Sequence, residues 1–242
     1  MLDSTRGIVF HKTRYGDSGA VVKIYTEKFG LQSFIVRGLF SRKSNARAAL
    51  FSHLSILDLV VDRKENKPLH YIREAGLHLN LTSLSTDIGR SSLVLFINEL
   101  LYRCIKEEEP NPALFDFILT VLQILNEPDV SLRTFHLLFM IKLTRYLGFS
   151  PAISKIAAGG VFDMEEGLFM TSEPMHAYFI SGPPAAALEQ LQSAGFHRLN
   201  EIAINSTVRD ELLDRLLDYY RLHVPGLGEM KSVRVLQEVL AE

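Results

Sequence analysis

Residues 21–36 read VVKIYTEKFGLQSFIV, and this stretch decides the fold of the N-terminal part of the chain. Two runs rich in β-branched and aromatic residues flank residues 28–30 (KFG), which have the composition of a turn. In the first run Lys23 and Tyr25 share one face, and aliphatic residues occupy the other. The pattern predicts two neighbouring β-strands, each with one face in a core.

Three further segments on either side of this stretch have the same character: 7–10, 54–61 and 69–81. Gly76 lies where the last of them is expected to bulge. Five short strands within about 80 residues, with no helical pattern between them, predict a small antiparallel barrel. The longest connection between strands runs from about Gly38 to Phe51.

After Leu84 the apolar residues recur at helical spacing. One predicted helical face contains Leu93, Phe96, Ile97, Leu100, Leu101, Cys104 and Ile105. A second helix is predicted over 114–125. A third, over 132–147, is apolar around most of its circumference, which places it at the centre of a bundle and ends it at Gly148.

The remaining third of the chain begins irregularly. Residues 161–164 and 168–170 predict a small hairpin, helices resume near Ala185, and the last helix covers 231–240. A helix over 208–222 is preceded by Thr207, which has capping-box spacing to Asp210. The predicted fold is therefore α+β, with a barrel domain at 1–81 and a helical domain at 82–242 that includes the irregular segment 149–184.

The charge of the chain is divided unevenly. The 242 residues are 47% hydrophobic and 22% charged, which is typical of a globular protein, and the formal net charge is −2. Residues 1–75 contain 13 Lys and Arg against 7 Asp and Glu, and the remaining residues contain 13 against 21. Residues 28–57 contain no acid. The asymmetry favours a polyanionic partner for the barrel, although a solvated charged face is the alternative.

Several classes of protein are excluded or disfavoured. The single cysteine, Cys104, cannot form an internal disulfide and indicates a reducing compartment. No apolar stretch approaches ~20 residues, and the N-terminus does not resemble a secretory signal. The eight histidines are scattered, and no nucleophile, phosphate-loop or dinucleotide motif occurs. We therefore expect no enzyme activity, no metal and no cofactor.

A single-stranded nucleic acid is bound by cations that contact its phosphates and by aromatic faces that stack on its bases. The candidate cations are Arg14, Lys23, Arg37, Arg42, Lys43 and Arg47. Tyr25 and Phe40 are the candidate stacking residues, and Phe34 is expected in the core.

The sequence also resembles a known family, the bacterial recombination mediators called RecO. The resemblance rests on 7–9, 13–18, 22–26, 30–38 and 42–44, then on 135–151, 212–220 and 231–236. It implies that the barrel is an OB-fold with a basic loop. Many members carry four cysteines after the position of Pro151, where they form a zinc module. Residues 151–184 contain no cysteine, so the resemblance implies a zinc-free variant.

The resemblance implies a non-enzymatic function in DNA repair. Such proteins bind single- and double-stranded DNA, anneal complementary strands and, with RecR, help load RecA onto strands coated by SSB; RecA and RecF are indirect partners. They also capture the C-terminal tail of SSB, for which Arg133 is the matching cation, with Lys142 and Arg145 nearby. Ordinary surface pairing of the latter two is an open alternative. A cytoplasmic, nucleoid-associated protein with no membrane partner is expected. The other functional hypothesis is a protein-interaction scaffold that binds no DNA.

Overall fold

The computed structural model forms two compact units. The first contains Met1–Thr86 and Ile97–Asn126, and the second contains Asp87–Phe96 and Glu127–Glu242. Helix α3 (Ile88–Cys104) therefore contributes residues to both units. The structure describes residues 2–40, 45–64, 67–152 and 160–240. The domain boundary after residue 81 stays a prediction.

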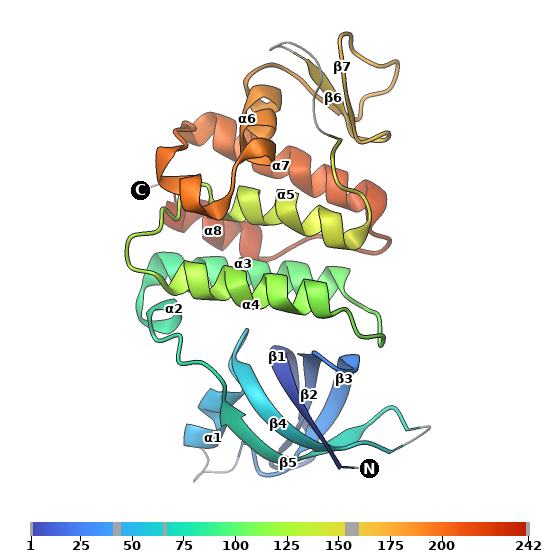
Figure 1. Ribbon diagram of the computed structural model, residues 1–242, viewed down its shortest axis with the longest axis vertical. Coiled ribbons are helices and arrows are strands. Elements are labelled where there is room, and N and C mark those ends of the chain that lie inside the picture. Colours follow the sequence, from blue (N-terminus) through green and yellow to red (C-terminus); the bar gives the residue numbers. More distant parts are fainter. Residues whose placement is uncertain (1, 41–44, 65–66, 153–159, 241–242) are drawn as a thin grey trace. The chain divides into compact units, whose positions relative to one another are not determined.

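Five strands close the barrel of the first unit in the order β1-β2-β3-β5-β4 (Figure 1). The strands are β1 (Leu2–Tyr15), β2 (Gly19–Thr26), β3 (Gly30–Val36), β4 (Ile56–Asp62) and β5 (His70–Leu77). Every pairing is antiparallel except the short parallel contact between β3 and β5, where Ile35 lies opposite Tyr71. This confirms the predicted α+β fold with an N-terminal barrel.

The inner face of the barrel is the alternate set of aliphatic and aromatic residues in each strand. Val22, Ile24 and Phe34 are fully buried in this core, as the alternation predicts. The predicted bulge at Gly76 is wrong, because Gly76 pairs in register with Asp58. The register instead shifts three residues earlier on β5, at Arg73, because Glu74 pairs with Val60 and Ile72 pairs with Val61.

The first unit also contains α1 (Asn45–Leu50), α2 (Ser83–Thr86), α4 (Pro112–Asn126) and the C-terminal part of α3. The predicted apolar face is confirmed, since all seven residues are buried; six belong to α3 and Ile105 directly follows it. Cys104 belongs to that face, and burial raises the pKa of its thiol to about 12. It is a small buried hydrophobe and not a nucleophile. The short α1, within the long connection after β3, was not predicted.

In the second unit α5 (Phe135–Leu147) is buried around most of its circumference, as predicted. Gly148 ends it in the left-handed conformation, with φ of 86°. Around it lie α6 (Gly182–Ser193), η1 (Phe196–Glu201), α7 (Ser206–His223), α8 (Ser232–Leu240), and a small sheet of β6 (Val161–Asp163), β7 (Leu168–Met170) and β8 (Phe179–Ile180).

The predicted hairpin is confirmed as β6 and β7, and β8 extends it to three strands. The predicted cap of α7 is wrong. Asn205 caps this helix, because its side chain accepts a hydrogen bond from the backbone N–H of Val208. None of the helices in the described residues has the length and apolar character needed to cross a bilayer.

Candidate nucleic-acid interface

The β1–β2 turn and the segment after β3 meet at one end of the barrel. The backbone N–H of Phe40 donates to the carbonyl oxygen of Ser18 at 2.9 Å. The guanidinium of Arg14 donates to the carbonyl oxygen of Asp17 at 3.0 Å. The first hydrogen bond fixes the two segments beside each other, and the second lies within the β1–β2 turn, so the side chains of both segments form one surface.

Three cations of this surface lie over aromatic rings. The guanidinium of Arg14 is 6.0 Å from the centre of the Phe40 ring, and that of Arg37 is 5.9 Å from the Tyr71 ring. The Lys64 amine lies 5.4 Å from the same Tyr71 ring. Within the described residues none of the three cations has a carboxylate partner at ion-pair distance. Their charges are available to an anion.

A hollow of about 510 Å³ lies in the middle of this surface. It is lined by Tyr15, Gly16, Asp17, Ser18, Gly19, Ile35, Arg37, Gly38 and Tyr71. The Tyr15 side chain is 53% exposed. Phe40, which comes two residues after the lining residue Gly38, is 41% exposed. Exposed aromatic rings beside guanidinium groups are suited to stacking on bases while the guanidinium groups contact phosphates.

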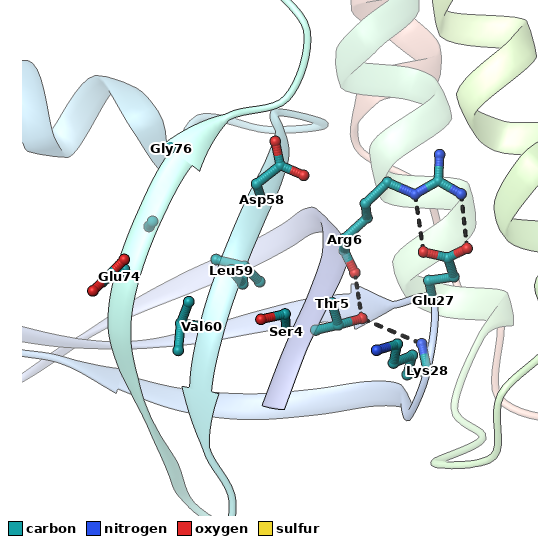
Figure 2. Close-up of a pocket in the computed structure, with 11 residues that line it drawn as sticks. Ser4, Thr5, Arg6, Glu27, Lys28, Asp58, Leu59, Val60, Glu74 and Gly76 are labelled. Carbon is teal, nitrogen blue, oxygen red and sulfur yellow. Dashed lines mark hydrogen bonds and ion pairs between the residues drawn. The ribbon is translucent and has the colours of Figure 1, made fainter. Parts of the chain in front are cut away.

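A second hollow in the first unit, of about 560 Å³, has a different character (Figure 2). Arg6 donates two hydrogen bonds to the carboxylate of Glu27, at 2.9 and 2.7 Å, and this pairing lowers the pKa of Glu27. Asp58 and Glu74 line other parts of this hollow, so its acids outnumber its cations even with Lys28. Because its arginine is neutralised and its acids repel phosphate, this hollow is unsuited to nucleic acid.

The structure brings Arg14, Arg37 and Phe40 together at the barrel end and places Lys23 elsewhere, with its amine 5.4 Å from the ring centre of Tyr102. Arg42 and Lys43 lie outside the described residues. Arg47 belongs to α1, and its side chain is outside the described part of the chain.

The prediction that Tyr25 stacks on bases is wrong. Its ring is 1% exposed and lies against Phe10 and Phe115, with ring centres 5.6 and 6.2 Å away. Its hydroxyl donates to the carbonyl oxygen of Asn111 at 3.3 Å, and burial raises its pKa to about 12. Phe115 belongs to α4, so this part of the outer barrel face is a packing surface.

Three residues of the interface were missed. Tyr15 was recognisable, because it is an aromatic residue directly before the turn at 16–18. Tyr71 was not, because it reaches the hollow only through the parallel pairing of β3 with β5, which no local pattern indicates, and Lys64 joins the interface only by lying over the Tyr71 ring. In the described part of the chain, no three His, Cys, Asp or Glu side chains gather as metal ligands.

The three cations predicted to bind a peptide tail lie in the second unit. Arg133 is exposed in the turn before α5, two residues short of the helix on which the sequence placed it. The Lys142 amine donates to the carbonyl oxygen of Gln192 at 2.9 Å. Burial, and then the charge of Arg145, lower its pKa. Arg145 is exposed near the end of α5.

Comparison with known proteins gives one consistent family. The family model described as Recombination protein O N terminal matches residues 1–80, and that described as Recombination protein O C terminal matches 85–232. DNA repair protein RecO of Bacteroides fragilis is 35% identical over 240 residues, with 99% of each chain covered. The proteins of the same name from Phocaeicola vulgatus and Christiangramia forsetii are 33% and 35% identical, with 100% and 99% of each chain covered.

Proposed function

The chain belongs to the RecO family of DNA repair proteins, and from this premise we propose that it is a non-enzymatic recombination mediator. It binds and anneals single-stranded DNA and, with RecR, helps load RecA onto strands coated by SSB. It also binds double-stranded DNA, and it acts on RecA and RecF indirectly. Because such a protein acts on chromosomal DNA, it is proposed to be cytoplasmic and associated with the nucleoid.

One observation carries the DNA-binding part of this proposal. Arg14, Arg37 and Lys64 lie over aromatic rings around a hollow and have no carboxylate partner in the described residues. A phosphate that enters the hollow meets unneutralised charge, and its base meets an exposed ring. Neither contact reads base identity, so we expect binding that is insensitive to sequence.

The salt dependence of binding to a single-stranded oligonucleotide tests this interface. If the six cations Arg14, Lys23, Arg37, Arg42, Lys43 and Arg47 all meet phosphates, the logarithm of affinity should fall against that of salt with a slope near −4, since each contact contributes about −0.7. Replacing Arg14 and Arg37 by glutamine leaves four contacts and should reduce the slope to about −2.8. Fluorescence anisotropy across a salt series measures both.

Arg73→Gln is the matched control for that experiment. Arg73 is also an exposed arginine of the barrel, but it forms an ion pair with Asp62 and lies over no ring in the described structure. It should leave the slope unchanged. A wild-type slope near zero, or equal slopes for the double variant and wild type, would contradict the interface.

The second unit is proposed to hold the acidic, apolar C-terminal tail of SSB. Such a tail needs a cation beside an apolar surface, and the exposed Arg133 follows the half-buried Val130 and Leu132 in the segment before α5. A labelled SSB tail peptide should bind the Arg133→Glu variant at least about tenfold more weakly, because the charge reversal replaces attraction by repulsion. Arg234→Glu, at an exposed site that pairs with Glu238, is the control. Equal affinity of wild type and Arg133→Glu would exclude this assignment.

A further inference from the structure

Three nitrogen-bearing side chains converge on the ring of Tyr102 near the end of α3. The imidazole of His11 stacks on it, with ring centres 4.9 Å apart and planes 17° apart. The amines of Lys106 and Lys23 lie 4.8 and 5.4 Å from the ring centre. All four residues belong to the first unit, and we call them the Tyr102 cluster.

Glu107 is the acid whose charge acts on Lys106, but no ion pair joins it to an amine of the Tyr102 cluster in the described residues. Among the described residues, neither Lys23 nor Lys106 has a carboxylate within ion-pair distance; the Lys106 amine donates to the carbonyl oxygen of Tyr102 instead, at 2.6 Å. The neighbouring Arg103 is paired with Glu99 at 2.7 Å. Partial burial and the charge of Lys23 lower the pKa of Lys106. The two amines therefore repel each other, and an anion between them would relieve that repulsion.

The Tyr102 cluster lies on the same face of the β1–β2 ribbon as the hollow at the barrel end. From His11 to Tyr15 the two strands pair without irregularity, with His11 opposite Lys23 and Tyr15 opposite Gly19. Alternation puts His11, Thr13 and Tyr15 on one face. Thr13 is exposed, and Tyr15 and Gly19 line the hollow. Four residues of strand span about 13 Å, so a strand that contacts both positions must be several nucleotides long.

We propose that the Tyr102 cluster is a second phosphate-binding site and that a single strand of nucleic acid runs along this face from the hollow at Tyr15 to Tyr102. The inference deepens the proposed DNA binding and partly rests on it. A nucleic acid fits better than an acidic protein segment, because an exposed aromatic residue, Tyr15, lies beside Arg37 at the hollow. The ring can stack on a base while the guanidinium contacts its phosphate.

Dependence on oligonucleotide length tests the path of the strand. The Lys23→Gln/Lys106→Gln variant should bind an oligothymidylate of about 12 nucleotides about tenfold more weakly, with a salt slope reduced by about 1.4. A dithymidylate is too short to span the about 13 Å between the hollow and the Tyr102 cluster, so its affinity for the hollow should not change. Arg73→Gln/Arg198→Gln removes two exposed, ion-paired arginines and is the control. Unchanged thermal unfolding establishes that each variant is folded.

The His11 imidazole reports on the site without DNA. Burial and the charge of Lys23 lower its pKa. The charged or titratable groups that act on it are Lys23 on β2, Tyr102 in α3 and His53, and the amine of Lys106 lies over the same Tyr102 ring. Pyrophosphate bound between the two amines should raise the His11 pKa in wild type and should not do so in the Lys23→Gln/Lys106→Gln variant. NMR titration of the His11 imidazole measures this pKa.

The two measurements separate failure of the site from failure of the proposed function. If oligonucleotides do not bind but pyrophosphate raises the His11 pKa, the DNA function fails and the anion site stands. If the double variant keeps wild-type affinity for the longer oligomer, the strand path is overturned. If pyrophosphate leaves the His11 pKa unchanged, the anion site itself is overturned.

Discussion

The Gly30→Ala variant is expected to lower the free energy of unfolding by at least about 3 kcal/mol. Gly30 begins β3 in the left-handed conformation, with φ of +63°. A Cβ atom there would lie 2.4 Å from the carbonyl oxygen of Glu109 and 2.8 Å from the carbonyl carbon of Glu108. These are backbone atoms and cannot rotate away. The next residue, Leu31, donates its N–H to the carbonyl oxygen of Glu107 at 3.0 Å, so relief of the clash also disturbs this hydrogen bond.

Gly16→Ala separates the clash from backbone strain. Gly16 lies in the β1–β2 turn of the same unit with a φ of +64°, and a Cβ atom there would meet nothing within 4 Å. It should cost about 1 kcal/mol, the price of the left-handed conformation for an L-residue. Urea denaturation of both variants gives the comparison. Equal losses of stability would show that the chain after α3 does not approach Gly30 so closely.

Alternation within one strand correctly predicted which residues face the barrel interior, but it did not predict which outward-facing residues are covered by a helix. Val22 and Ile24 had to be internal once the barrel closed, and they are. The same alternation placed Lys23 and Tyr25 outside, but it cannot distinguish solvent from a covering helix. Phe115 of α4 lies against Tyr25, while Lys23 keeps its amine at the Tyr102 ring. The partner helix is about 90 residues away in sequence, so no local pattern could show it.

The interface was predictable to the extent that its residues lie beside turns. Arg14, Arg37 and Phe40 adjoin turn signals, and the structure brings them to one surface. Tyr71 joins them because β5 inserts between β3 and β4 in the barrel order. The strand order depends on pairings between strands that are far apart in the sequence. Because the five strands have similar composition, the sequence of each strand alone does not determine its partners.

The last of our predictions concerns His136, a titratable residue that the sequence analysis did not single out. It lies on α5 with 1% of its surface exposed, edge-on to the ring of Phe96 at 6.1 Å. In the described structure its Nδ1 atom has no hydrogen-bond partner. Burial, and then the charge of Arg209, lower its pKa to about 3. The folded protein therefore keeps this imidazole neutral over the pH range in which an ordinary histidine becomes protonated.

This lowered pKa makes stability depend on pH in a definite direction. In the unfolded chain the imidazole binds a proton below its ordinary pKa of about 6.5, while the folded state does not until about pH 3. The unfolded state is therefore favoured progressively as the pH falls through this window, by about 1.4 kcal/mol per unit. At pH 7 the residue contributes almost nothing to this effect, and at pH 5 it destabilises the fold by about 2 kcal/mol.

The His136→Leu variant should abolish that contribution. Whatever its stability at pH 7, its free energy of unfolding should fall by about 2 kcal/mol less than that of wild type between pH 7 and pH 5. Taking the difference between the two pH values cancels any packing change, since packing of a leucine does not titrate. His197→Leu, at an exposed position of η1, should follow the wild-type pH dependence. If His136→Leu also follows it, the imidazole must be protonated in the folded state and have solvent or a hydrogen-bond acceptor within reach, which is incompatible with its burial in α5.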